Sequence, residues 1–478
     1  MSKPARPRSA AEQRLPPQLQ AVRLHAAGID VGATEHWVAV PEGADPQRVR
    51  RFGACTADLE ALADWLAACG VTSVALESTG VYWIALFELL ERRGFEVLLV
   101  DPRQFHQMSG RPKTDVHDCQ WLQRLHTCGL LAGAFRPDDQ VVVLRSYLRQ
   151  RAELLAEAGR DIQHLQKALT QMNVKLQHVV ADTVGVTGLS IIRAIVAGER
   201  DPAKLAKLRD PRCKQSEAAI ARALLGNWRD EHLFALAQAL EAYDFHHRQL
   251  AACDRRIEAE LGKFPDRSGG AAPPPRPGKR AKGKARRNQP AFDARRPLYR
   301  MAGVDLTVIE GIEETTALIL IGEIGLDMSR WPTEKHFCSW LCLCPNRRIS
   351  GGRTLSSHTK KGASRAAMAL RLAARSLERS KSALGAFFRR LRGRLGMPKA
   401  ITAAAHKLAR LVYAVLKHGT AYVAQEMAAY ERQYRERLVQ AGRNGYPIRL
   451  RVRMTTGPTL APVCSRESHH ERPSSCSA

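Results

Sequence analysis

The sequence predicts an α/β domain near the N-terminus, then a long helical region, then a mainly α-helical domain. Three observations support this order. Short apolar runs alternate with helix-like spacings from about residue 24 to residue 130. Apolar residues then recur at steps of three and four over about five heptads. The last third of the chain combines basic, amphipathic stretches with turn-rich loops.

In the first domain, residues 24–135, strands and helices alternate. We expect strands at residues 25–40 (two strands with a turn near Gly32), 49–54, 74–77 and 95–100. We expect helices at residues 56–68, 81–93 and from Thr114, a good N-cap residue, to about Gly129. This order is that of an RNase H-like fold, in which helices cover both faces of a mixed sheet.

Four acidic residues stand at the ends of these elements. Asp30 lies in the first strand, and Glu77 ends the fourth. Asp115 and Asp118 are three residues apart, so they share one face of the first helical turn. Like charges held close together repel each other, and a bound cation relieves that cost. We therefore predict that the four carboxylates hold Mg²⁺ or Mn²⁺; the alternative is solvated acids at strand ends and a helix cap.

A heptad pattern follows the first domain and predicts a coiled coil within residues 140–263. The apolar positions are Val141, Leu144, Leu148, Leu155, Ala158, Ile162, Leu165, Leu169, Met172, Leu176 and Val179. Arg151 interrupts this stripe, and His247 interrupts a second, weaker stripe from Leu233 to Leu261. Both polar residues are expected to be register or edge features rather than ligands. The two helices could pair within one chain or between two chains.

Three segments are predicted to be disordered: residues 1–23, the linker 264–297 and the tail 440–478. The linker contains Pro273-Pro274-Pro275 and a basic run at residues 279–287. That run either binds phosphate without sequence preference or serves as a plain spacer.

The C-terminal domain, residues 298–439, contains two segments of interest. Gly311, before a helix that runs through Ile321, resembles the second half of a helix-hairpin-helix, whose backbone N–H groups approach DNA phosphate. Ser350 lies in a turn-rich basic loop and is either a nucleophile or an ordinary turn serine. The basic residues expected to contact nucleic acid there are Arg347, Arg348, Arg353, Lys360, Lys361 and Arg365.

The composition narrows the class of partner. The 478 residues include 74 Lys and Arg against 47 Asp and Glu, a net charge of +27, which favours DNA or RNA as the partner. No apolar run is long enough to span a bilayer, and the polar N-terminus lacks an export signal, so we expect a cytoplasmic protein.

The 11 cysteines do not suggest a disulfide framework. Cys338, Cys342 and Cys344 do not have zinc-ligand spacing and are expected to be core residues.

The motifs GIDVG, ALESTGVYW, KTDVHD and CLCPNRRISGG together resemble the DEDD transposases of insertion-sequence family 110, nearest to its 1111 subgroup. The resemblance covers residues from about 26 to about 425. Position by position, the family's four acids match Asp30, Glu77, Asp115 and Asp118, and its nucleophilic serine matches Ser350.

The resemblance implies a RuvC-like, metal-dependent nuclease domain joined to a serine-bearing transposase domain. It also implies an RNA, encoded by the element, that pairs with donor and target DNA. We expect a homo-oligomer, a dimer or a tetramer, that excises and inserts double-stranded DNA of an insertion sequence. Two alternatives are a hydrolytic junction resolvase, which needs the acids but no serine, and a non-enzymatic packaging protein, which needs only the charge.

Overall fold

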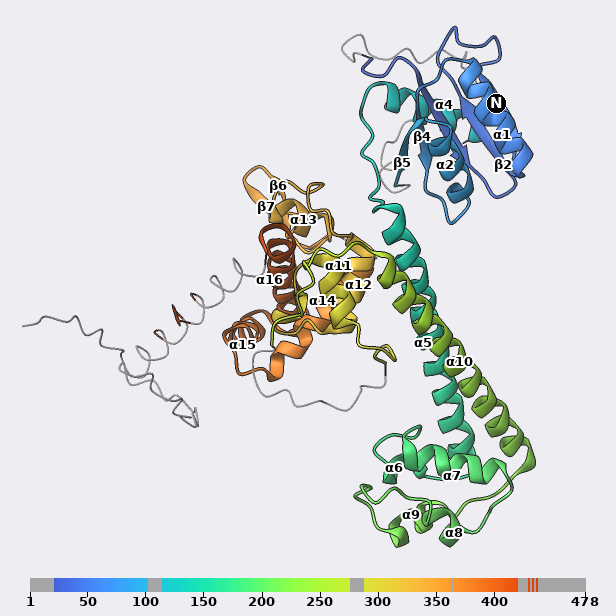
Figure 1. The fold of residues 1–478 in the computed structure, drawn as a ribbon, viewed down its shortest axis with the longest axis vertical. Helices are drawn as coiled ribbons and strands as arrows, with labels where there is room; N and C mark the ends of the chain where they lie inside the picture. The colour runs from blue at the N-terminus through green and yellow to red at the C-terminus, as the bar shows by residue number, and fades with distance from the viewer. Residues whose placement is uncertain are drawn as a thin grey trace, which may run out of the picture. The chain divides into compact units, whose positions relative to one another are not determined.

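The computed structural model describes residues 21–101, 114–275, 288–360, 362 and 364–419, together with residues 429, 432, 433 and 436. The predicted basic run 279–287 and the predicted tail lie outside the described residues. The chain divides into two compact units, Met1–Asp138 and Asp139–Ala478 (Figure 1). None of the described helices combines the length and the apolar character that crossing a membrane requires.

The first unit is built on a five-stranded mixed sheet. Its strands are β1 (Ala26–Val31), β2 (Glu35–Ala39), β3 (Val49–Gly53), β4 (Ser73–Glu77) and β5 (Glu96–Val100), in the order β3-β2-β1-β4-β5. β1 is antiparallel to β2 and parallel to β4, and β4 is parallel to β5. The predicted mixed sheet is confirmed, and the run at residues 25–40 is indeed two strands. This architecture is consistent with an RNase H-like α/β domain.

Helices cover both faces of this sheet. α1 (Thr56–Ala68) and α2 (Trp83–Arg92) bury Leu62, Leu66 and Leu90 against one face, together with Ile29 and Leu76 of the strands. The helix α4 (Asp115–Thr127) covers the opposite face with Leu122 and Leu125. Because strand side chains alternate between faces, neighbouring residues such as Leu76 and Ala75 belong to different cores.

The helix after β4 begins later than the sequence predicts. The prediction starts it at Val81, whereas α2 begins at Trp83. Gly80 has a φ of 56°, and the Trp83 Nε1 donates a hydrogen bond to the Gly80 carbonyl at 3.2 Å. These two features close a turn between Glu77 and the helix, so Val81 and Tyr82 lie in that turn.

The backbone of α4 packs directly on the backbone of β1 at Gly28. A Cβ on Gly28 would lie 2.3 Å from the Gln123 N and 2.5 Å from the Cys119 O, so only glycine fits there. The Gln123 Nε2 donates to the Ala26 O at 3.2 Å, and the Thr127 O accepts from the Val22 N at 2.8 Å. α4 therefore runs antiparallel to β1, with its N-terminus at the carboxyl end of that strand.

The fully buried His126 of α4 makes stability depend on pH. Its Nε2 lies 2.8 Å from the Ser73 Oγ, and burial lowers its pKa from 6.5 to about 4. The unfolded chain therefore binds a proton that the folded chain rejects, so this stability is complete above about pH 6.5 and is lost as the pH falls toward 4. We expect the free energy of unfolding to fall by about 3 kcal/mol over that range, measured by denaturant titration. His126→Gln should show a smaller fall, and an equal fall would assign the effect to another group.

The second unit begins with two long helices that pack side by side within one chain (Figure 1). They are α5 (Asp139–Gln171) and α10 (Asp230–Lys263). The Arg151 Nε donates to the Asp254 Oδ1 at 2.5 Å, and both side chains are buried. The Arg151 residue that interrupts the predicted stripe thus holds the two helices together. The two helices are thus paired within the single chain of this structure, and pairing between two chains stays a prediction.

The heptad pattern is wrong in one respect, because it predicts an unbroken stripe through Val179. α5 ends at Gln171, and Asn173 follows with a φ of 57°, a left-handed conformation that asparagine tolerates. Met172 and Leu176 lie beyond this end and share one hydrophobic cluster with Leu165 and Leu169 of α5 and with Ile192. Besides α5 and α10, the helices of this cluster are α6 (Leu176–Val179), α7 (Val186–Val196), α8 (Pro202–Ala206) and α9 (Glu217–Ala223).

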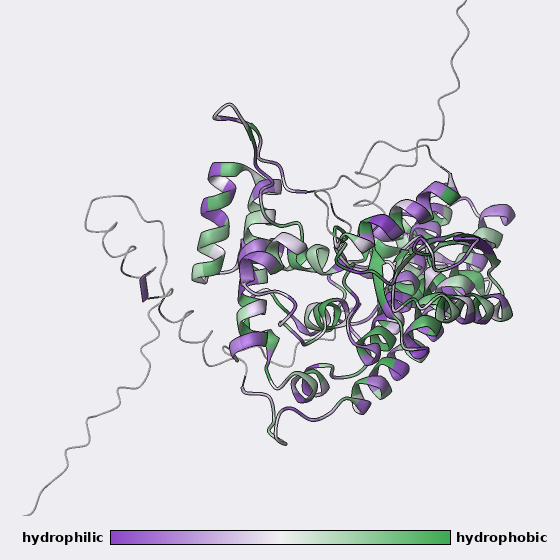
Figure 2. Cartoon of the chain, turned by 90° about the horizontal axis from the view of Figure 1, so that it is seen from above, coloured by the Kyte–Doolittle hydropathy of each residue, from purple (hydrophilic) through white to green (hydrophobic). Residues whose placement is uncertain are grey.

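The remainder of the second unit is mainly helical, as predicted. Its elements are α11 (Arg295–Ala302), η1 (Leu306–Val308), α12 (Glu314–Ile324), α13 (Glu334–Trp340), β6 (Arg348–Ser350), β7 (Arg353–Ser356), α14 (Arg365–Ser376), η2 (Leu377–Arg379), α15 (Ala383–Leu395) and α16 (Met397–His418). α16 buries Leu408 and Val412, and the Tyr413 hydroxyl donates to the Trp331 O at 2.7 Å. Hydrophobic and hydrophilic residues alternate along the helices (Figure 2), as expected where one helix face is buried.

The turn predicted as part of a helix-hairpin-helix packs against the protein itself. Gly311 has a φ of 88°, and a Cβ there would lie 3.0 Å from the Ala373 O of α14. Glu313 and Glu314 follow at the start of α12, where negative charge opposes a phosphate. Close packing on α14 explains the glycine, and phosphate contact by this turn stays a prediction.

Candidate active site

Asp30 and Glu77 lie at the carboxyl ends of two neighbouring parallel strands. β1 and β4 pair with Gly28 opposite Ala75 and Ile29 opposite Leu76, so the next step of the register brings Asp30 beside Glu77. Both acids share the sheet face of Gly28 and Ala75, which α4 covers. Glu77 is only 7% exposed, and its Oε1 accepts a hydrogen bond from the Thr79 Oγ1 at 3.2 Å.

The N-terminus of α4 brings two further acids to this edge. Thr114 is the N-cap, as predicted, because its Oγ1 accepts from the His117 N at 3.3 Å. Asp118 is 8% exposed, whereas Asp115 is exposed to solvent. The positive end of the helix dipole favours carboxylates in this first turn.

The packing of α4 on β1 indicates how near these acids are to one another. The Cys119 carbonyl lies against Gly28, two residues before Asp30. The pKa of the Cys119 thiol is raised to about 12, first by burial and then by the charges of Asp30 and Asp118. Asp118 directly precedes Cys119, so the backbone contact with Gly28 brings the first turn of α4 to the carboxyl end of β1.

The four predicted ligands therefore lie at one edge of the sheet, but they are not arranged as the ligands of a metal ion. Asp30 and Glu77 are neighbours on β1 and β4, Asp118 lies in the first turn of α4 at the same edge, and Asp115 is exposed to solvent. Within the described residues, no group of three or more His, Cys, Asp or Glu side chains is arranged to hold a metal ion. In donor type, these carboxylate oxygens fit Mg²⁺ or Mn²⁺.

Ser350 occupies the end of a short, exposed β-hairpin in the second unit. It pairs with Arg353, and the two residues between them, Gly351 and Gly352, have φ values of 55° and 75°. Positive φ at both positions makes the two-residue turn that suits a hairpin. All three residues of β6 are exposed, so the Ser350 hydroxyl is accessible. Ser350 and the acids thus belong to different units of the chain.

Comparison with known families identifies both units. A family model of DEDD transposases of the IS110 type, described as transposase, matches residues 27–174. A second model, described as transposase of the IS116/IS110/IS902 family, matches residues 305–389. The chain belongs to the IS110 family of transposases. No curated protein matches the sequence.

These matches cover the residues that sequence analysis singled out. The first match includes the four acids, and the second includes Ser350. Membership of a transposase family implies an enzyme that processes DNA. The 1111 subgroup is not tested by these matches and stays a prediction.

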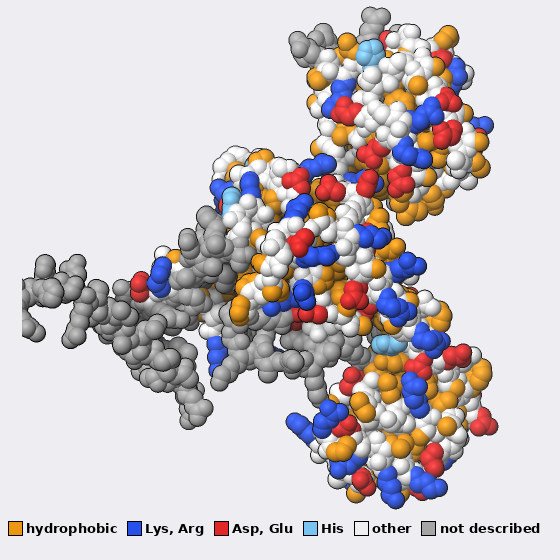
Figure 3. All heavy atoms as spheres, viewed as in Figure 1, with side chains coloured by type: hydrophobic (Ala, Val, Ile, Leu, Met, Phe, Trp, Pro, Cys, Tyr) orange, Lys and Arg blue, Asp and Glu red, His pale blue; other side chains and the backbone are white. Residues whose placement is uncertain are grey.

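The predicted nucleic-acid contacts of this transposase surround the hairpin. Arg347, Arg348, Arg353 and Lys360 are exposed, whereas Lys361 lies outside the described residues. Arg365 is also exposed, and its Nη2 lies 3.0 Å from the Glu153 Oε1 of α5. An ion pair this exposed contributes little, so Arg365 can exchange it for a phosphate. On the face drawn in Figure 3, Lys and Arg are interspersed with Asp and Glu over both units.

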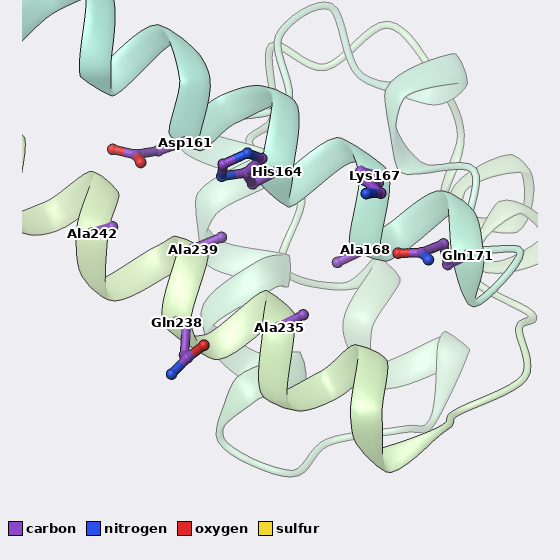
Figure 4. A pocket seen from close by; sticks show the side chains of 9 residues that line it. All are labelled: Asp161, His164, Lys167, Ala168, Gln171, Ala235, Gln238, Ala239 and Ala242. Atoms are coloured by element: carbon purple, nitrogen blue, oxygen red, sulfur yellow. The ribbon is translucent and has the colours of Figure 1, made fainter.

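Sequence analysis missed a pocket and an exposed apolar group. A pocket of about 370 Å³ lies between α5 and α10, where Ala235, Ala239 and Ala242 leave space opposite His164 and Lys167 (Figure 4). Short alanine side chains explain the space. The apolar group is Val81, Tyr82 and Ile84, just after Glu77. Its sequence signal, four consecutive large hydrophobic residues after a glycine, also fits the start of a helix.

Proposed function

We propose that this transposase cuts and rejoins DNA through attack of Ser350 on a phosphodiester, assisted by a divalent metal at the acidic edge of the sheet. The observation that carries the proposal is the meeting of Asp30, Glu77 and Asp118 at the carboxyl ends of β1 and β4. Isolated structural acids would have no reason to share one edge with two of them buried.

The acidic residues have separate roles in this scheme. Asp30, Glu77, Asp115 and Asp118 would hold Mg²⁺ or Mn²⁺, which supplies charge stabilisation for a phosphoryl transfer. Glu77 and Asp118, both buried, keep bulk water from the inner side of the site. Asp115 is exposed at the first turn of α4, on the side from which a DNA phosphate must enter.

Ser350 forms the covalent intermediate. Its Oγ attacks the phosphorus, the bond from phosphorus to the leaving sugar oxygen breaks, and that oxygen takes up a proton. The resulting phosphoserine ester conserves the bond energy, so a second sugar hydroxyl can displace the serine and rejoin the strands without ATP. A neutral serine is a weak nucleophile and needs activation by a metal or a base, which takes up the hydroxyl proton. This need is the reason to propose that serine and acids act together in a homo-oligomer.

Sequence selection is proposed to rest on an RNA encoded by the element, because the family resemblance implies one. Base pairing would then read the DNA, and the protein would bind backbone and shape. The exposed Arg347, Arg348 and Arg353 beside Ser350 suit contact with a phosphate backbone.

A recombination assay separates this function from its two alternatives. We expect Asp115→Ala and Ser350→Ala each to abolish strand exchange on DNA that carries the element ends. A hydrolytic junction resolvase would instead still release free ends when serine is replaced. A packaging protein would show no strand exchange in the wild type and would bind DNA equally well in both variants.

A further inference from the structure

The turn between Glu77 and α2 exposes large hydrophobic side chains beside the acidic edge. Val81 is 68% exposed, Tyr82 49% and Ile84 39%. In the described part of the first unit, the other strongly exposed hydrophobic residues are Val22, Leu24 and Leu130. Those lie near Thr127, at the opposite end of α4 from the acids. The group after Glu77 is therefore the apolar surface that belongs to the candidate active site.

The backbone of this turn is held firmly. The Ser78 N and Oγ both donate to the Val100 O, at 3.0 and 2.9 Å. The Thr79 hydroxyl binds Glu77 itself, and the Trp83 indole binds the Gly80 carbonyl. A segment fixed at both ends presents its exposed side chains with little loss of entropy on binding.

The Tyr82 ring packs against Gly80, within the turn that follows Glu77. A Cβ on Gly80 would lie 3.4 Å from the Tyr82 Cε2 and 3.5 Å from its Cδ2, so the ring rests against the glycine. Gly80 stands three residues after Glu77 and has a φ of 56°. The glycine thus permits both the turn and the position of the ring.

We propose that Tyr82 stacks on an unpaired base of the DNA strand whose phosphate lies at the acidic edge, while Val81 packs against the neighbouring sugar. This inference rests on the proposed function. Stacking on an aromatic side chain suits every base, because every base offers a π face. The base must be unpaired, because a base inside a duplex does not offer its face.

The size of the apolar group favours a base over a protein partner. A stable protein interface buries at least about 1,000 Å² in total. Three neighbouring side chains cannot supply an area of that order, whereas one ring and one aliphatic side chain match a single nucleotide. The Tyr82 side chain also keeps a polar end, which suits a wet nucleic-acid interface.

Photochemical cross-linking of the full chain tests this contact. The probe is a single-stranded DNA oligonucleotide that carries 5-iododeoxyuridine, irradiated with the protein, and the attachment site is mapped by mass spectrometry. We expect attachment to the peptide that contains Tyr82. Tyr82→Phe should keep the cross-link, and Tyr82→Ala should reduce it by about tenfold. Phe234→Ala, which removes an aromatic side chain 65% exposed on α10, is the matched control and should change nothing.

Three outcomes would overturn the proposal: an unlabelled Tyr82 peptide while other peptides are labelled, undiminished labelling in a folded Tyr82→Ala chain, or labelling there by an iodouridine RNA alone. The experiment is repeated with Ser350→Ala, since cross-linking needs no cleavage. A cross-link at Tyr82 in a wild-type chain that shows no strand exchange would refute the proposed reaction and leave this contact standing.

Discussion

Ser350→Ala is expected to remove the covalent link between protein and DNA. When the wild-type reaction is stopped with denaturant, a phosphoserine adduct should be present and should map to the peptide that contains Ser350. The variant should form none, and strand exchange should fall on the order of a thousandfold or more, because no other group replaces the attacking oxygen. Denaturing gel electrophoresis with labelled DNA measures both quantities.

The position of Ser350 makes this result easy to interpret. The residue is exposed at the end of β6, so its replacement by alanine leaves no cavity and breaks no core contact. Ser356, on the paired strand β7, provides the matched control, and Ser356→Ala should retain the adduct. If Ser350→Ala still forms an adduct at wild-type yield, the nucleophile is another residue.

Asp118→Asn is expected to remove most of the stabilisation that a divalent metal gives to the folded transposase. A metal that binds only the folded chain stabilises it by about 2.7 kcal/mol when its concentration is a hundred times the dissociation constant. Wild type should therefore gain thermal stability in Mn²⁺, and the variant should lose most of that gain. Without metal the variant should be at least as stable as wild type, because one of several neighbouring negative charges has gone.

Thermal unfolding with and without Mn²⁺ measures this difference. Glu60→Gln, on α1 and away from the acidic edge, is the control and should keep the gain. Strand exchange should be lost in Asp118→Asn and kept in Glu60→Gln. An Asp118→Asn chain that Mn²⁺ stabilises as much as wild type would remove Asp118 from the metal site.

The meeting of the acids was predictable in part. Strand ends and a helix start are the places where a sheet edge collects side chains, so Asp30, Glu77 and Asp118 could be grouped from their positions along the chain. The direction of α4 could not be predicted from the sequence, because it depends on contact between Gly28 and the backbone at Cys119 and Gln123. Those residues are about 90 positions apart, and sequence spacing carries no information on such contacts.

The heptad pattern shows the limit of periodicity. Met172 and Leu176 continue the spacing of α5 beyond the end of that helix, because they belong to the same hydrophobic cluster as Leu165 and Leu169. Where an apolar core continues past the end of a helix, the heptad spacing of apolar residues can continue beyond that helix. The sequence predicts Arg151 to be a register or edge feature, and only the fold reveals its buried partner Asp254.

The apolar residues after Glu77 were misassigned for a related reason. Val81 and Tyr82 have the composition of a buried helix start, and the prediction placed them there. Their exposure follows from Gly80, whose left-handed conformation delays the helix until Trp83. Glycine permits that conformation without requiring it, so the sequence alone leaves both outcomes open.

The central claim, that the carboxyl edge of the first sheet holds a divalent metal, is tested most directly by anomalous diffraction from crystals of the full chain grown with Mn²⁺. The account predicts an anomalous peak bounded by the carboxylates of Asp30, Glu77 and Asp118. Manganese bound elsewhere, with no peak at these three residues, would contradict it.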